Sequence, residues 1–193
     1  MATGTLAITG DFDADQLLNT DPLALLVGML LDQQVPMEWA FMGPYRLAGR
    51  LGSSLGAATI AAMDPEEFAE VVKRKPALHR FPGSMAGRIQ QLCQHLVDEY
   101  DGDAEAVWRD VESGAELYRR LKALPGYGDE KARIFMAILA KRFGHAPAGW
   151  EQAAQPFSDS APRSVADIDG PDSLAKVREW KKAQKAKGKL KTQ

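Results

Sequence analysis

The chain has 193 residues, of which 45% are hydrophobic, so it is long enough and apolar enough to bury a core as one domain or two small lobes. No run of about 18 uncharged apolar residues occurs, and the N-terminus lacks the basic start and apolar stretch of a signal peptide. We therefore expect a cytoplasmic protein with no membrane partner. The net charge of −2 is unevenly spread: residues 173–193 carry +7 and the preceding residues carry −9. Such an acidic body argues against a large nonspecific nucleic-acid footprint.

The single cysteine, Cys93, excludes an internal disulfide, and we expect it to pack among apolar neighbours. The three histidines, His79, His95 and His145, show no paired metal-ligand spacing, so we assign none of them to a metal.

Almost every segment predicts helix, and no segment shows the alternation of a strand, so the expected fold class is all-α. Helix starts are predicted at Asp21-Pro22, at Asp64-Pro65 and at Ser113, where Glu116 completes a capping box. Pro36 can open a helix, which Pro44 is expected to break or kink.

Further along the chain, a long helix is expected over residues 84–100 and an irregular connection over residues 155–172. A last helix is expected from residue 173, with Leu174, Val177 and Trp180 on its packing side. Its lysine-rich end is either a solvated helix end or a surface that neutralises phosphates.

The most informative segment is the turn Leu-Pro-Gly-Tyr-Gly at residues 124–128, which joins two amphipathic stretches. Apolar residues lie at helical spacing on both sides of it, which predicts helix, hairpin, helix. Gly126 and Gly128 can take backbone angles that a residue with a Cβ resists, so the turn can point consecutive N–H groups outward at the start of the next helix. Such a turn attracts an anion, although a C-cap followed by an N-cap has the same appearance.

Three segments in the same order, residues 25–45, 81–100 and 121–138, resemble core segments of the HhH-GPD base-excision repair superfamily. The resemblance covers roughly residues 22–151. It implies an all-α, two-lobed HhH-GPD architecture over residues 1–172, with the helix-hairpin-helix at about 113–142 and residues 173–193 as a basic C-terminal helix and tail. It further implies a monomer that binds double-stranded DNA. One cysteine cannot supply the four-cysteine iron–sulfur cluster that several relatives carry, so no such cofactor is expected.

The resemblance also implies a catalytic carboxylate beneath the sugar, where positive charge develops as a glycosidic bond breaks. The family's Asp follows an aromatic-glycine pair, and counting from Phe143-Gly144 leads to Glu151. We expect Glu151 at a helix start, where N–H dipoles keep it ionised. The alternative is that Glu151 is only an exposed helix-terminal carboxylate. The other acids considered are Asp159, Asp167 and Asp169.

Bifunctional relatives carry an attacking lysine two residues after the second hairpin glycine, and Glu130 holds that position here. Lys131 follows, but one residue along a helix turns a side chain by about 100°. The chain therefore resembles the monofunctional branch, which uses an activated water, and Lys131 is expected to contact a phosphate or solvent.

The resemblance places Gln33 and Gln34 in a DNA-facing loop, where an amide can fill the gap left by a flipped nucleotide. Gln34 is the first choice. Among the aromatic residues, Tyr127 is expected to be exposed on the hairpin, whereas Trp39, Phe41 and Tyr45 fit a core as well as a base pocket. The predicted DNA-binding residues are thus Gln33, Gln34, Leu124, Gly126, Tyr127, Gly128 and Lys131. A cation at the hairpin carbonyls of Leu124 or Gly126 is compatible with the resemblance.

These residues favour a monofunctional DNA N-glycosylase that hydrolyses a damaged or mismatched base from duplex DNA. The main alternative is a catalytically inactive helix-hairpin-helix DNA-binding protein. A helical interaction protein with no role on nucleic acid is a third interpretation.

Overall fold

The computed structural model describes residues 4–186 and 188. All regular elements in these ranges are helical, which confirms the expected fold class. The α-helices are α1 (Phe12–Thr20), α2 (Pro22–Leu31), α3 (Met37–Leu51), α4 (Ala57–Ala62), α5 (Pro65–Lys73), α6 (Pro82–Tyr100), α7 (Gly114–Ala123), α8 (Asp129–Phe143), α9 (Trp150–Ala153) and α10 (Pro171–Ala186). Two short 3₁₀ helices, η1 (Ala104–Val107) and η2 (Val165–Asp167), lie between them.

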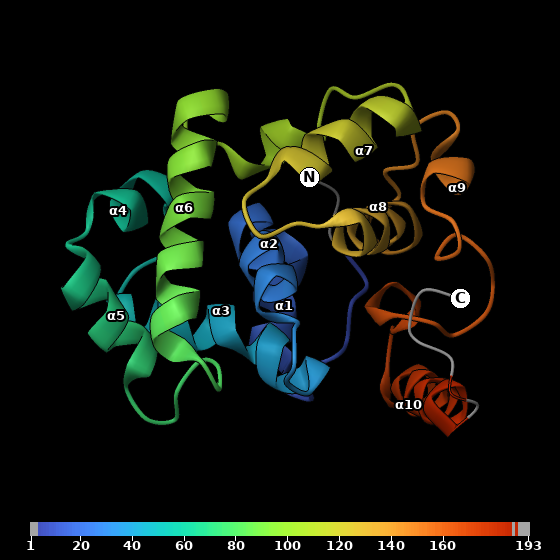
Figure 1. The fold of residues 1–193 in the computed structure, drawn as a ribbon, viewed down its shortest axis with the longest axis horizontal. Coiled ribbons are helices and arrows are strands. Elements are labelled where there is room, and N and C mark those ends of the chain that lie inside the picture. Colours follow the sequence, from blue (N-terminus) through green and yellow to red (C-terminus); the bar gives the residue numbers. More distant parts are fainter. Residues whose placement is uncertain (1–3, 187, 189–193) are drawn as a thin grey trace.

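The helices form two groups on either side of α2 (Figure 1). Helices α4 and α5 pack against α6 on one side, while α7, α8 and α9 pack together on the other. Helix α10 lies below α8 in this view and is joined to it through η2. Nine residues of α2, Leu23 to Leu31, are buried, as expected of a helix that is apolar all round. α2 is thus the central helix, and its C-terminal end leads into the loop at residues 32–36.

The predicted helix starts are confirmed. The Asp21 carboxylate accepts hydrogen bonds from the N–H groups of Leu23 and Ala24, and Asp64 caps α5 in the same way. Ser113 caps α7 by accepting from the Glu116 N–H group. These caps depend on two to four consecutive residues, which explains why the sequence revealed them.

Pro44 was expected to break or kink its helix; a break is wrong, because α3 continues through this residue to Leu51, and a kink stays a prediction. Proline costs the helix one backbone hydrogen bond, but burial of the helix face offsets that loss. Gly43 supports the tight fit: a Cβ there would lie 2.4 Å from Leu31 Cδ1, so α2 and α3 approach closely at this point.

The C-terminal helix begins at Pro171, two residues before the expected start. Val177 is buried, and Leu174 packs against the core, as predicted. Five of the eight basic residues of the predicted C-terminal helix and tail lie on α10, and the other three, Lys187, Lys189 and Lys191, lie outside the described residues. Cys93 is buried on α6, and burial raises the pKa of its thiol to about 12. None of the helices in the described part combines the length and hydropathy needed to cross a bilayer.

Candidate nucleic-acid interface

The predicted hairpin is present: α7 ends at Ala123, and α8 begins at Asp129. Gly126 has a φ of +82°, in the left-handed region that favours glycine. A Cβ on Gly126 would also lie 2.3 Å from Leu30 Cδ1. The fold therefore requires glycine here for two independent reasons, backbone conformation and close contact with α2.

Gly128 differs, and the expectation that its backbone angles need glycine was wrong. Its φ of −86° and ψ of −176° are accessible to any residue, and a Cβ there would meet nothing within 4 Å. Gly128 is exposed at the N-cap of α8, and no side chain caps this helix. The first N–H groups of α8 thus have no side-chain acceptor, and the space beside Gly128 is open to an anion.

The expectation that Tyr127 is exposed on the hairpin was also wrong. Its side chain is 4% exposed, and its hydroxyl donates a hydrogen bond of 2.8 Å to the Leu26 carbonyl. Its ring packs edge-on against Phe135, and burial raises the pKa of the phenol well above its usual value. Leu124 is buried too, and its carbonyl accepts from the Tyr127 N–H group. These two side chains anchor the hairpin to the core, so they are not positioned to contact DNA.

Two carboxylates lie in the first turn of α8, where they compete with a bound anion. Asp129 accepts a hydrogen bond from the Tyr118 hydroxyl, which lowers the pKa of the carboxyl together with nearby Arg133 and Lys122. The Arg133 Nε atom lies 3.1 Å from Asp129, and the Lys122 Nζ atom lies 3.7 Å from it. Asp129 is therefore compensated by cations at the same end of the hairpin.

Lys131 contacts the protein backbone, whereas the sequence led us to expect contact with a phosphate or solvent. Its ammonium group lies 2.8 Å from the Met29 carbonyl and 2.5 Å from the Leu30 carbonyl. These carbonyls belong to the last turn of α2, where the helix dipole attracts a cation. Lys131 thus links the start of α8 to the end of α2.

The two predicted glutamines lie in the loop after α2, and their side chains have different surroundings. The Gln33 side chain donates to the Leu30 carbonyl and accepts from Arg88, so its amide is already engaged. Gln34 is exposed, has a φ of +56° and lies at the edge of a cavity. A positive φ is uncommon for a residue other than glycine, so the surrounding contacts must hold this conformation. Gln34 is the amide that is free to reach a ligand.

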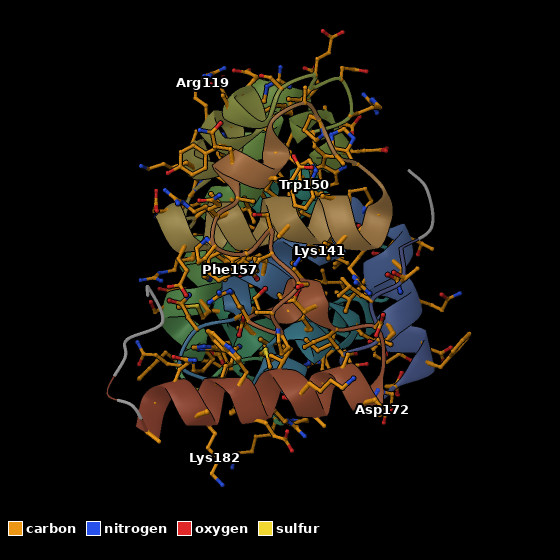
Figure 2. All side chains as sticks on the ribbon, turned by 90° about the vertical axis from the view of Figure 1, so that its right-hand side faces the viewer. Arg119, Lys141, Trp150, Phe157, Asp172 and Lys182 are labelled. Carbon is orange, nitrogen blue, oxygen red and sulfur yellow. The ribbon has the colours of Figure 1, made fainter. Side chains whose placement is uncertain are left out.

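The cavity, of about 260 Å³, lies between the loop after α2, the start of α8, the segment after α9, and α10. Figure 2 shows the C-terminal side of the molecule, where Phe157 lies between α8 and α10 while Lys182 points away from the body. The walls of the cavity combine apolar, polar and charged side chains: Met29, Asp32, Gln33, Gln34, Glu130, Lys131, Ile134, Pro156, Phe157, Arg163, Ser164, Val165, Trp180 and Lys181. The Arg163 guanidinium lies 5.1 Å from the centre of the Trp180 ring, which fixes this aromatic wall.

Glu151 lies at the start of α9, as predicted, but the structure does not bring it to this cavity. Its side chain is exposed, and α9 packs against α7 and α8. The packing of α9 leaves the Glu151 carboxylate apart from the residues that line the cavity, and its catalytic role stays a prediction. The carboxylates that do line the cavity are Asp32 and Glu130.

The three other acids considered are held in ion pairs. Asp159 pairs with Arg163 at 2.6 Å, and a hydrogen bond from that guanidinium lowers the pKa of the carboxyl. Asp167 pairs with Lys141 at 2.6 Å, and Asp169 with Arg142 at 2.8 Å. The pairs of Asp167 and Asp169 fasten the segment between α9 and α10 to α8, and the Asp159–Arg163 pair lies within that segment. The three acids therefore act in the structure of that segment.

Sequence reasoning missed two residues beside the Gln34 loop. His79 is buried, and Phe81 is 45% exposed at the N-cap of α6. A phenylalanine just before a predicted helix start was a usable signal, whereas the contact of His79 with Gln33 joins residues 46 positions apart in the sequence. In the described part of the chain no group of His, Cys, Asp or Glu is arranged to hold a metal ion. A cation at the hairpin carbonyls stays a prediction.

Comparison with known proteins gives a likeness of fold. No family model and no curated protein matches the chain. Two solved structures are similar: a trapped covalent endonuclease III–DNA intermediate with an estranged adenine, and a non-covalent endonuclease III–DNA complex. The first has 22% identity, a TM-score of 0.46 and covers 81% of this chain; the second has 20%, 0.47 and 83%.

This chain spans 65% and 67% of the lengths of those two endonuclease III chains, or about two thirds. Both similarities are partial.

Proposed function

We propose that the protein binds duplex DNA through the α7–α8 hairpin and removes a base that is turned out of the helix into the cavity beside Gln34. The observation that carries this proposal is the uncapped, exposed start of α8 at Gly128, next to that cavity. Backbone N–H groups at a helix N-terminus bind phosphate oxygens, and Gly128 leaves room for close approach.

Two exposed side chains are suited to enter the DNA stack. The Gln34 amide can hydrogen-bond an unpaired base, and the exposed Phe81 ring can wedge between base steps. They lie on neighbouring loops, since His79 between them contacts the backbone on both sides. Insertion by these residues would offset part of the cost of unstacking the target nucleotide.

The cavity suits one flipped base. Its volume of about 260 Å³ falls just below the usual range for drug-sized ligands, roughly 300–1,000 Å³. Phe157 and Trp180 provide flat apolar surfaces, and Lys131 and Glu130 provide charge. A nucleobase stacks on such surfaces while its polar edge meets the charged groups.

For the chemistry we propose Glu130, in place of Glu151, as the carboxylate that faces the sugar. Positive charge develops on the sugar as the N-glycosidic bond breaks, and a carboxylate in the cavity stabilises it. Water then adds to the sugar carbon, its proton passes to the carboxylate, and the base leaves with the bonding electron pair. Asp32 is the second carboxylate of the cavity and can orient the water.

The proposal includes a monofunctional reaction. An attacking lysine must bring its amine to the sugar, but two backbone carbonyls accept hydrogen bonds from the Lys131 side chain and hold its Nζ atom at the end of α2. We expect base release without an efficient borohydride-trapped adduct, and product strands that break only after alkali. Efficient trapping that disappears in Lys131→Ala would identify Lys131 as a nucleophile.

The competing function is a DNA-binding module without catalysis, which the exposed position of Glu151 away from the cavity favours. An assay of abasic-site formation on duplexes with different damaged or mismatched bases separates the two. We expect base release by the unmodified protein, its loss in Glu130→Gln, and unchanged activity in Glu151→Gln, the matched control. Duplex binding with no base release from any substrate would favour the module.

A further inference from the structure

His79 joins the loop at residues 32–36, which lines the cavity, to the segment that leads into α6. It is 1% exposed, and its Nε2 atom lies 2.8 Å from the Gln33 carbonyl oxygen. The Phe81 N–H group donates to its Nδ1 atom at 3.1 Å. Because a backbone N–H group can only donate, Nδ1 must be the acceptor, and the ring proton must lie on Nε2, which donates to Gln33. The two contacts together fix a neutral ring and its tautomer.

The contact with Gln33 fixes the residue that precedes the exposed Gln34. The other side of Gln33 is held by Leu30 and Arg88, whose guanidinium lies 3.0 Å from the side-chain oxygen. Between these contacts and Pro36, the backbone of Gln34 adopts its φ of +56°. Without a hydrogen bond to the Gln33 carbonyl, the chain could relax toward a more common conformation.

We infer that His79 is a positioning residue that couples the Gln34 loop to the Phe81 loop, so that both exposed side chains enter DNA together. The inference rests on the proposed function for its consequence on DNA, but the coupling itself is a property of the free protein. His79 touches neither base nor phosphate in this arrangement. It acts through the Gln33 carbonyl and the Phe81 N–H group.

The coupling should depend on pH. A second proton on the ring would place an N–H group at Nδ1, facing the N–H group of Phe81, so that contact would break. Burial lowers the pKa of His79 most, and the hydrogen bond to the Gln33 carbonyl acts in the opposite direction. Three nearby cations, Lys131 of α8, Arg80 in the segment before α6 and Arg88 of α6, lower the pKa further. Since the folded pKa lies below the ordinary value, the coupling is complete above that ordinary value and is lost as pH falls through the lowered one.

The first test uses the free protein and two variants. His79→Leu removes both contacts, while His79→Gln keeps one donor and one acceptor on a side chain that does not titrate. Amide hydrogen exchange read by NMR should show Phe81 N–H exchanging at least tenfold faster in His79→Leu and nearly unchanged in His79→Gln. The Ala132 N–H group, which donates to the Gly128 carbonyl in the hairpin, is the internal control.

Equal Phe81 exchange in the unmodified protein and in a folded His79→Leu variant would overturn the inference. If His79→Leu does not fold, lowering the pH of the unmodified protein makes the same test. Phe81 exchange, corrected for its intrinsic pH dependence, should then rise relative to Ala132, and this rise should be absent in His79→Gln. No such difference would equally overturn it.

The second test measures the consequence on DNA with a duplex that carries 2-aminopurine beside an abasic or mismatched position. The unmodified protein should raise the fluorescence as bases unstack, and His79→Leu should lose most of this rise while duplex affinity falls less than threefold. In the unmodified protein this fluorescence rise should decline at acid pH. His79→Gln should restore the rise that His79→Leu loses, and the rise in His79→Gln should not decline at acid pH. Failure of the unmodified protein to bind any duplex would contradict the proposed function alone, because the exchange experiment decides the coupling independently.

Discussion

Two loops adjoin the last turn of α2, but they are held in different ways. The hairpin turn at residues 124–128 is fixed by its own backbone at Gly126 and by Tyr127, which is anchored in α2. The loop at residues 32–36 carries a non-glycine residue at positive φ and depends on His79, 46 residues further along the chain. The hairpin turn contains no group that titrates near neutral pH, so its affinity for a phosphate should not change with pH in that range. The loop at residues 32–36 should respond to pH through His79.

The largest effect should come from Gly126, where both the positive φ and the contact with Leu30 exclude a side chain. Gly126→Val should lower the free energy of unfolding by about 2–5 kcal/mol, by adding backbone strain to overpacking. Chemical denaturation followed by circular dichroism measures this change. An unchanged midpoint would mean that the turn is not fixed by its local backbone.

The hydroxyl of Tyr127 provides a finer test of how the turn is anchored. Tyr127→Phe removes a buried hydrogen bond to the Leu26 carbonyl, which keeps its helical donor within α2, and should cost about 0.5–1.5 kcal/mol of stability. Duplex affinity of the folded variant should stay the same, since this side chain is buried. A selective loss of DNA binding with normal stability would restore Tyr127 as a DNA contact.

A substitution at Gly128, in the same turn, should weaken duplex binding and leave the stability of the protein almost unchanged. A Cβ there meets no protein atom, so Gly128→Val should change the free energy of unfolding by no more than about 0.5 kcal/mol. It should weaken duplex binding severalfold, because the side chain occupies the space of an approaching phosphate. Fluorescence anisotropy at fixed salt measures the affinity, and unchanged affinity would remove the hairpin from the DNA interface.

The smallest effect should come from the C-terminal lysines. Cutting the chain after Ala186 removes three lysines and leaves all of α10 in place. For every DNA phosphate that these lysines neutralise, the truncation should reduce the slope of log affinity against log salt by about 0.9. A slope equal to that of the full chain would show that these lysines are a solvated end and that the folded part accounts for the salt dependence.

The contrast between the loops also explains which expectations held. Helix starts at Asp21 and Asp64, the hairpin, and the requirement for glycine at Gly126 depend on a few consecutive residues. They were predictable because neighbours in sequence impose caps and backbone angles directly. The preference for Gln34 over Gln33 was also reasonable, and the structure supplies its reason by engaging the Gln33 amide.

The direction of a side chain, by contrast, was decided by segments far away in the sequence. Tyr127 turns into the core, where its hydroxyl donates to the carbonyl of Leu26, a residue 101 positions earlier in the sequence. Lys131 turns toward carbonyls at the end of α2, which are equally distant in the sequence. Glu151 begins a helix as its local sequence predicts, yet the packing of α9 against α7 and α8 leaves it outside the cavity. The sequence by itself determined the helices, their caps and the hairpin, because backbone conformation responds to adjacent residues. The tertiary structure alone decided which carboxylates and amides meet, because that depends on how distant helices pack.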